Sequence, residues 1–157
     1  MINTVTVYCK EYVAHYLRRV YPYHKFEEFV QFPPSSIVRH TFLNTLEKKF
    51  HPSSDYNVKV FPAKVQIVIR VNDLSQYGVS VKPALHYHIN SVFEEKIKNE
   101  LFFIITKMRD EVKGLSLRDA ILAYQKMYNF KEETFSYEAI AQSYQRCKPK
   151  IFYKNSA

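Results

Sequence analysis

The sequence predicts an α+β fold, in which a small, mostly antiparallel sheet packs against a long central helix and the C-terminal third is helical. Two observations lead to this prediction. Alternating apolar residues, a pattern typical of half-buried strands, occur in the first half of the chain, most clearly at 4–8 and 65–71. From Pro83 onward, apolar residues recur at intervals of three and four, which is the spacing of one helix face. The length of 157 residues fits one domain better than two.

The first half is predicted to mix strands with helices. The predicted strands are 4–8, 28–32, 57–61 and 65–71, and the predicted helices are 10–20 and about 36–49. Ser35 or Ser36 can cap the second helix, since a serine hydroxyl accepts an N–H of the first turn. A turn at 62–64 would join the last two strands in a hairpin. Residues 72–78 are predicted to form a loop.

The second half is predicted to be helical throughout. An amphipathic helix of about seven turns begins near Pro83, whose missing N–H costs nothing in a first turn. Two shorter helices follow over 116–129 and 136–146, joined by a tight polar link.

A subdivision of the chain is the alternative to one domain. It separates an α/β part at 1–78, a helical part at 79–146 and a basic tail at 147–157. A sheet-bearing domain followed by a three-helix unit, with Gly78 or Gly114 near the boundary, also fits.

The charge of the chain favours an anionic partner, because its net charge is +8 and its pI is near 9.4. The segment from Arg146 onward has no acidic residue. Its cations are Arg146, Lys148, Lys150 and Lys154, and Phe152 and Tyr153 lie among them. Cations neutralise phosphates while aromatic rings stack on bases, so this segment is predicted to contact nucleic acid. The alternative is a solvated tail whose two aromatic side chains dock on the body.

The two last helices also fit a helix-turn-helix, which binds DNA through its second helix. In that arrangement, the exposed side of the last helix would offer Gln142, Gln145, Arg146 and Lys148. Gln and Arg side chains can each form two hydrogen bonds to a base edge. A purely structural helical hairpin has the same sequence pattern, so this alternative stays open.

Motifs of catalysis and cofactor binding are missing from the sequence. With Gly78 and Gly114 as its only glycines, the chain has no phosphate-binding loop. His86 and His88 point apart on a predicted helix and make a poor metal pair. We therefore predict a protein that is not an enzyme and that holds no cofactor and no metal; a nuclease site of dispersed acidic residues has no motif to support it.

The compartment is predicted to be the cytoplasm. Cys9 and Cys147 lie at opposite ends of the chain, which favours two free thiols in a reducing environment. The first residues lack the pattern of a signal peptide. No run of about 18 apolar residues occurs, so we expect no membrane contact.

Three segments together carry a resemblance. They are VYCKEYV at 7–13, VQFP at 30–33 before the serine-capped helix, and YEAIAQSYQR at 137–146. Their combination resembles small proteins encoded by phages and integrated mobile elements of Bacteroides-type bacteria. The resemblance implies no known enzymatic activity. It does imply a role in handling DNA, since many small basic proteins of mobile elements act on DNA.

These observations lead to two hypotheses about function. The favoured one is a non-enzymatic accessory protein of a phage or mobile element that binds nucleic acid, with DNA as the expected form. The alternative is a structural or protein–protein interaction protein without affinity for nucleic acid, which binds a protein partner or forms a homo-oligomer.

Overall fold

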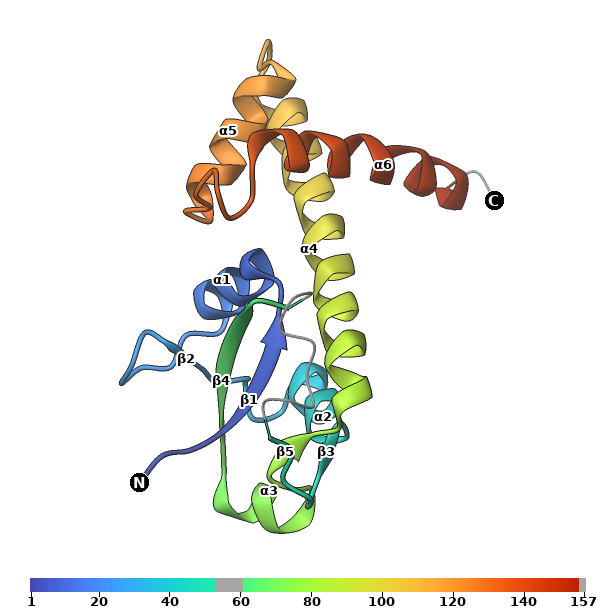
Figure 1. Ribbon diagram of the computed structural model, residues 1–157. Helices are drawn as coiled ribbons and strands as arrows, with labels where there is room; N and C mark the ends of the chain where they lie inside the picture. The colour runs from blue at the N-terminus through green and yellow to red at the C-terminus, as the bar shows by residue number, and fades with distance from the viewer. Residues whose placement is uncertain (53–60, 156–157) are drawn as a thin grey trace. The chain divides into compact units, whose positions relative to one another are not determined.

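The structure, a computed structural model, describes residues 1–52 and 61–155 (Figure 1), and for 148–155 it describes the backbone only. The chain divides into two compact units, Met1–Val92 (unit 1) and Phe93–Ala157 (unit 2). The predicted α+β class is confirmed, since unit 1 carries small sheets together with helices and the described part of unit 2 is helical. The boundary between the units falls inside one long helix.

The sheet of unit 1 has three strands in the order β1-β4-β2. β1 (Asn3–Cys9) runs antiparallel to β4 (Ala63–Ile69) over its whole length, and β2 (Phe29–Val30) runs parallel to β4. Alternate residues point to one face, so every second residue is buried from Val5 to Cys9 in β1 and from Val65 to Ile69 in β4. The buried side chains are Val5, Val7, Cys9, Val65, Ile67 and Ile69. The period-two pattern therefore located both long strands.

The predicted hairpin is wrong where the structure tests it. Residues 63 and 64, expected to turn, already belong to β4 and lie opposite Cys9 and Tyr8 of β1. The other predicted strand, 57–61, falls outside the described residues except for Phe61, which is buried.

Helix α1 (Glu11–Val20) follows β1 as predicted and buries Val13, Tyr16 and Leu17. Helix α2 (Ile37–Leu43) is capped by Ser36, whose Oγ accepts the Arg39 N–H at 3.1 Å. It ends well before the predicted Lys49.

The early end of α2 has a local cause. Both the backbone N–H of Thr45 and its hydroxyl, at 2.6 Å, donate to the Phe42 carbonyl. These bonds replace the next helical bond, because a threonine side chain competes with the helix for its carbonyls. The next two residues form β3 (Leu46–Glu47), which pairs antiparallel with β5 (Ser80–Val81).

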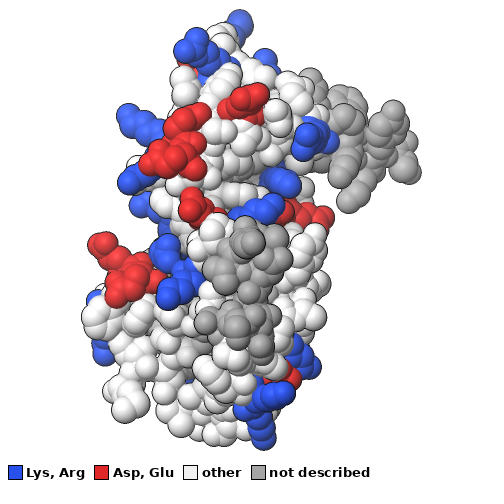
Figure 2. All heavy atoms as spheres, in the orientation of Figure 1, with Lys and Arg blue, Asp and Glu red and all other residues white. Residues whose placement is uncertain are grey.

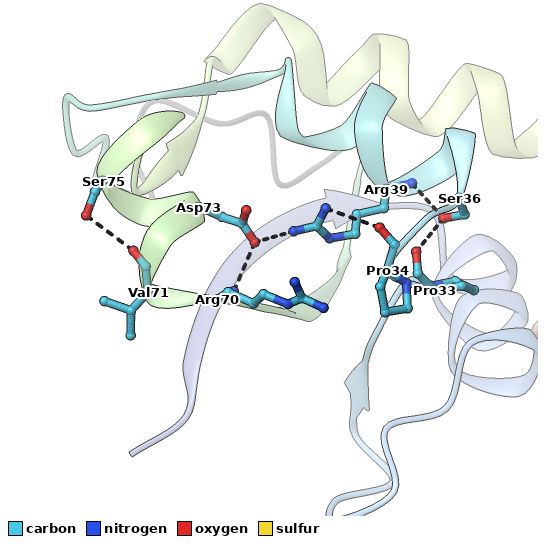
Figure 3. Close-up of polar contacts among 8 residues, drawn as sticks. All are labelled: Pro33, Pro34, Ser36, Arg39, Arg70, Val71, Asp73 and Ser75. Atoms are coloured by element: carbon cyan, nitrogen blue, oxygen red, sulfur yellow. Dashed lines mark hydrogen bonds and ion pairs between the residues drawn. The ribbon is translucent and has the colours of Figure 1, made fainter.

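The loop predicted at 72–78 is also wrong, because most of it forms the helix α3 (Val71–Gln76). The Asp73 carboxylate accepts the Arg70 N–H at 3.2 Å, which caps the helix start (Figure 3). The same oxygen accepts the Arg39 guanidinium from α2 at 2.5 Å. A helix of six residues is too short to show a period in the sequence, and the Arg39 side chain that binds Asp73 lies 34 residues away.

The long helix α4 (Pro83–Glu111) starts where predicted and has 29 residues. In unit 1 its side chains reach the end of β1. The Tyr8 N–H donates to His86 Nδ1 and the Lys10 N–H donates to Asn90 Oδ1, each at 3.0 Å. Among the described strands β1 pairs with β4 alone, and these two bonds satisfy N–H groups at the C-terminal end of β1 and just after it.

Unit 2 contains the rest of α4, α5 (Leu117–Met127) and α6 (Tyr137–Asn155). Its core is made of fully buried apolar side chains from all three helices. They are Ile97, Leu101, Ile105, Ile121, Tyr124 and Ile140. The last helix is longer than predicted, since its backbone continues through most of the expected basic tail to Asn155 (Figure 1).

Candidate nucleic-acid interface

The connection between α5 and α6 is longer than the tight link predicted from the sequence. It runs over residues 128–136, whereas a helix-turn-helix uses a turn of about three or four residues. Asn129 has a φ of 54°, and the Phe130 N–H closes the end of α5 by donating to the Gln125 carbonyl at 2.9 Å. Phe130 and Phe135 are each only 5% exposed and pack edge to face. The connection is therefore held in place by two buried phenylalanine side chains.

The start of α6 is held against α5 by polar side chains. The Glu132 carboxylate accepts the Tyr137 N–H at 3.1 Å and the Gln125 side-chain amide at 2.9 Å. Both hydrogen bonds lower the pKa of Glu132 below its ordinary value, and the bond from Gln125 has the larger effect. Ser136 adds a cap, because its Oγ accepts the Ala139 N–H at 3.1 Å. The first turn of α6 thus has a fixed position relative to α5.

The inner side of α6 packs on α4 within unit 2. Ile140 and Tyr144 are buried, and the Tyr144 ring stacks on Phe102 with centroids 5.1 Å apart. One turn later, the Cys147 thiol donates to the Lys98 carbonyl at 3.8 Å. Because these contacts bury one side of α6, the opposite side is exposed to solvent.

The open side of α6 carries four exposed polar residues, which we call the outer stripe: Glu138, Gln142, Gln145 and Arg146. Their spacing of three and four places them on one helix face. Three of them were predicted from the sequence as candidate contacts, and the structure brings these three together. Glu138 was missed, although its position four residues before Gln142 was a usable signal.

The other predicted contacts cannot be placed in the same way. Lys148, Lys150, Phe152, Tyr153 and Lys154 belong to α6 by their backbone, but their side chains lie outside the described residues.

Charge is distributed unevenly along unit 2. Residues 93–147 contain nine Lys and Arg and nine Asp and Glu, so their charges cancel. Figure 2 shows acidic and basic side chains interspersed on the face that it displays. Lys148, Lys150 and Lys154 therefore supply the whole net positive charge of unit 2. Unit 1 has eleven basic and six acidic residues.

No protein-family model, curated protein or solved structure matches this chain.

Among the described residues, no group of three or more His, Cys, Asp or Glu side chains could hold a metal ion. His86 is buried and His88 is exposed on α4, so these two side chains point apart as the helix spacing predicted. Within the same residues, none of the helices has the length and apolar character needed to span a membrane.

The two thiols should differ strongly in reactivity. Cys9 is fully buried in the sheet, and burial raises its pKa to about 12, whereas Cys147 is half-buried on α6. Because the thiolate is the reactive form, we expect a maleimide to modify native Cys147 at least about 100-fold faster than Cys9. Mass spectrometry of peptides after timed labelling measures both rates. Equal rates in the native protein would contradict the buried position of Cys9.

Proposed function

We propose that this protein is a non-enzymatic, nucleic-acid-binding accessory protein of a phage or mobile element, that it acts on DNA in the cytoplasm, and that α6 is its binding element. The observation that carries the proposal is the outer stripe, which ends in Arg146, and every charged residue after Arg146 in the sequence is a lysine. Cations on one helix can neutralise neighbouring phosphates of a backbone. The two cysteines lie at opposite ends of the sequence, which fits a reducing compartment.

The charge balance of unit 2 supports the choice of α6. Since the charges of residues 93–147 cancel, attraction of this unit to phosphate depends on the cations that follow. Arg146 begins that group and is exposed on the outer stripe. Phe152 and Tyr153 add rings that can stack on bases or pack beside sugars.

Neutralising the C-terminal cations should therefore weaken binding. In the variant with Arg146, Lys148, Lys150 and Lys154 all changed to Gln, we expect the affinity for DNA to fall by at least about tenfold near 0.1 M salt. The slope of log affinity against log salt should also become shallower, by about 0.9 for each phosphate that the variant no longer neutralises. Fluorescence anisotropy of labelled duplex and single-stranded DNA across a salt series measures both quantities.

A matched control removes the same charge elsewhere in unit 2. Lys113, Arg118, Lys126 and Lys131 are also one arginine and three lysines, and all are exposed. Changing these four to Gln should leave the salt slope nearly unchanged. An unchanged slope in the C-terminal variant would refute binding through α6, and it would direct attention to the basic unit 1.

One observation favours a second function, that of a protein-interaction module. Leu122 and Met127 are 42% and 48% exposed on α5, although neither is polar. Exposed apolar side chains contribute to a contact surface where they join others in a patch. On this hypothesis the chain binds no DNA at low salt, and sedimentation velocity shows concentration-dependent self-association that Leu122→Ser weakens.

A further inference from the structure

The outer stripe of α6 has an unusual chemistry for a surface that only contacts phosphate. Arg146 is its single cation, Gln142 and Gln145 are neutral, and Glu138 is an acid. A carboxylate next to a phosphate is repelled, so Glu138 would weaken a purely electrostatic contact. The same side chain accepts a hydrogen bond from the amino group of cytosine. Gln pairs with adenine and Arg with guanine in the same groove, each through two hydrogen bonds.

The dimensions of the stripe fit the major groove of a duplex. From Glu138 to Arg146 the helix rises about 12 Å, at about 1.5 Å for each residue. This rise corresponds to roughly three to four base pairs at about 3.4 Å each. An α-helix with its side chains is about 10–12 Å across, which matches a major groove about 12 Å wide and exceeds a minor groove of about 6 Å.

The helix that carries the stripe is also held firmly, as base reading requires. Its start is fixed by Glu132 and Ser136, and its inner side is packed through Tyr144 on Phe102. A side chain that projects from a fixed helix loses little freedom when it binds. Contacts to phosphate would come from the cations beyond Arg146, which set the register of the helix without reading sequence.

We infer that α6 enters the major groove of duplex DNA and that Glu138, Gln142, Gln145 and Arg146 read base edges there, so that the protein prefers particular sequences. This inference rests on the proposed function and adds to it the form of the nucleic acid and the source of specificity. Duplex DNA is the expected ligand because only its major groove is both wide enough for a helix and distinct for each base pair.

The test begins with selection from a duplex library whose centre is randomised, using the full chain. We expect a preferred site of about three to four base pairs. The Gln142→Ala, Gln145→Ala double variant should then bind this site about 10- to 100-fold more weakly, while its affinity for unrelated duplex and its salt slope stay unchanged. Arg146→Lys keeps the charge and should lose part of the preference, because lysine lacks the planar two-pronged donor.

Two controls accompany these variants. Arg118→Lys makes the same chemical change at an exposed position on α5 and should leave the sequence preference unchanged. Thermal unfolding followed by circular dichroism should show that all variants fold, because the changed side chains are exposed.

The outcomes separate this inference from the proposed function. Binding to duplex DNA without a sequence preference, or a preference that survives the double variant, would overturn base reading while leaving nucleic-acid binding in place. Tighter binding to single-stranded DNA or to RNA would do the same. Absence of binding to every nucleic acid at low salt would overturn both.

Discussion

Replacing Gly78 with alanine should lower the free energy of unfolding of unit 1 by at least about 3 kcal/mol. The glycine has a φ of 141°, and a Cβ added there would lie 2.2 Å from the backbone carbonyl carbon and oxygen of Glu47. The neighbouring Val79 N–H donates to that same carbonyl at 3.0 Å. Because backbone rather than a flexible side chain occupies the space, β3 and β5 would have to separate. Urea denaturation followed by circular dichroism measures the decrease in stability.

Gly114→Ala is the matched control for this substitution. Gly114 also has a positive φ, of 82°, but a Cβ added there would meet no atom within 4 Å. We expect this change to cost only the backbone strain, about 1–2 kcal/mol. Hydrogen exchange should show reduced protection at β3 and β5 in Gly78→Ala and normal protection there in Gly114→Ala. Similar decreases of stability in the two variants would mean that the contact with Glu47 is not tight.

The elements that the sequence predicted well are those with a long, regular pattern. β1 and β4 have seven residues each with alternating burial, and α4 repeats its apolar spacing over many turns. The spacing of apolar residues in the sequence is therefore enough to identify these elements. The misjudged elements are short, and each depends on a single side-chain contact. The six residues of α3 are stabilised by Arg39 of α2, and α2 stops at Leu43 because Thr45 binds the Phe42 carbonyl. Neither contact leaves a periodic signal in the sequence.

The candidate interface was predictable only in part. The spacing of Gln142, Gln145 and Arg146 places them on one face of any helix, and the apolar residues Ile140 and Tyr144 indicate which face turns inward. The structure of the connection before α6 was not predictable, because the polar residues 131–133 are typical of an unpacked loop. Nothing in that pattern indicates that Phe130 packs on Phe135 or that Glu132 forms hydrogen bonds. These contacts join residues five to seven positions apart and hold the start of α6, which the base-reading inference requires.

Because of the contact between His86 and β1, we expect the stability of unit 1 to depend on pH. The His86 side chain is buried, and burial lowers its pKa from 6.5 to about 4, with a smaller contribution from the nearby His51, which itself contacts Glu47. The Tyr8 ring packs edge-on against the imidazole, with centroids 5.6 Å apart. Since Nδ1 accepts the Tyr8 N–H, a proton on that nitrogen would face another hydrogen and break the bond. The neutral ring is therefore the form that unit 1 accommodates.

Unit 1 should consequently lose stability as the pH falls from 6.5 to 4. In this window the unfolded chain binds a proton at His86 that the folded chain excludes, so the free energy of unfolding should drop by about 3 kcal/mol over the whole range. Above about pH 7.5 the group is neutral in both states and contributes no pH dependence. Urea denaturation at a series of pH values measures the free energy of unfolding. Subtracting the pH profile of His86→Gln from that of the unchanged protein removes the contributions of all other titrating groups. The matched control is His88→Gln, two residues along the same helix and exposed, whose profile should follow that of the unchanged protein. If His86→Gln also follows it, the His86 imidazole is not the group responsible for the decrease in stability.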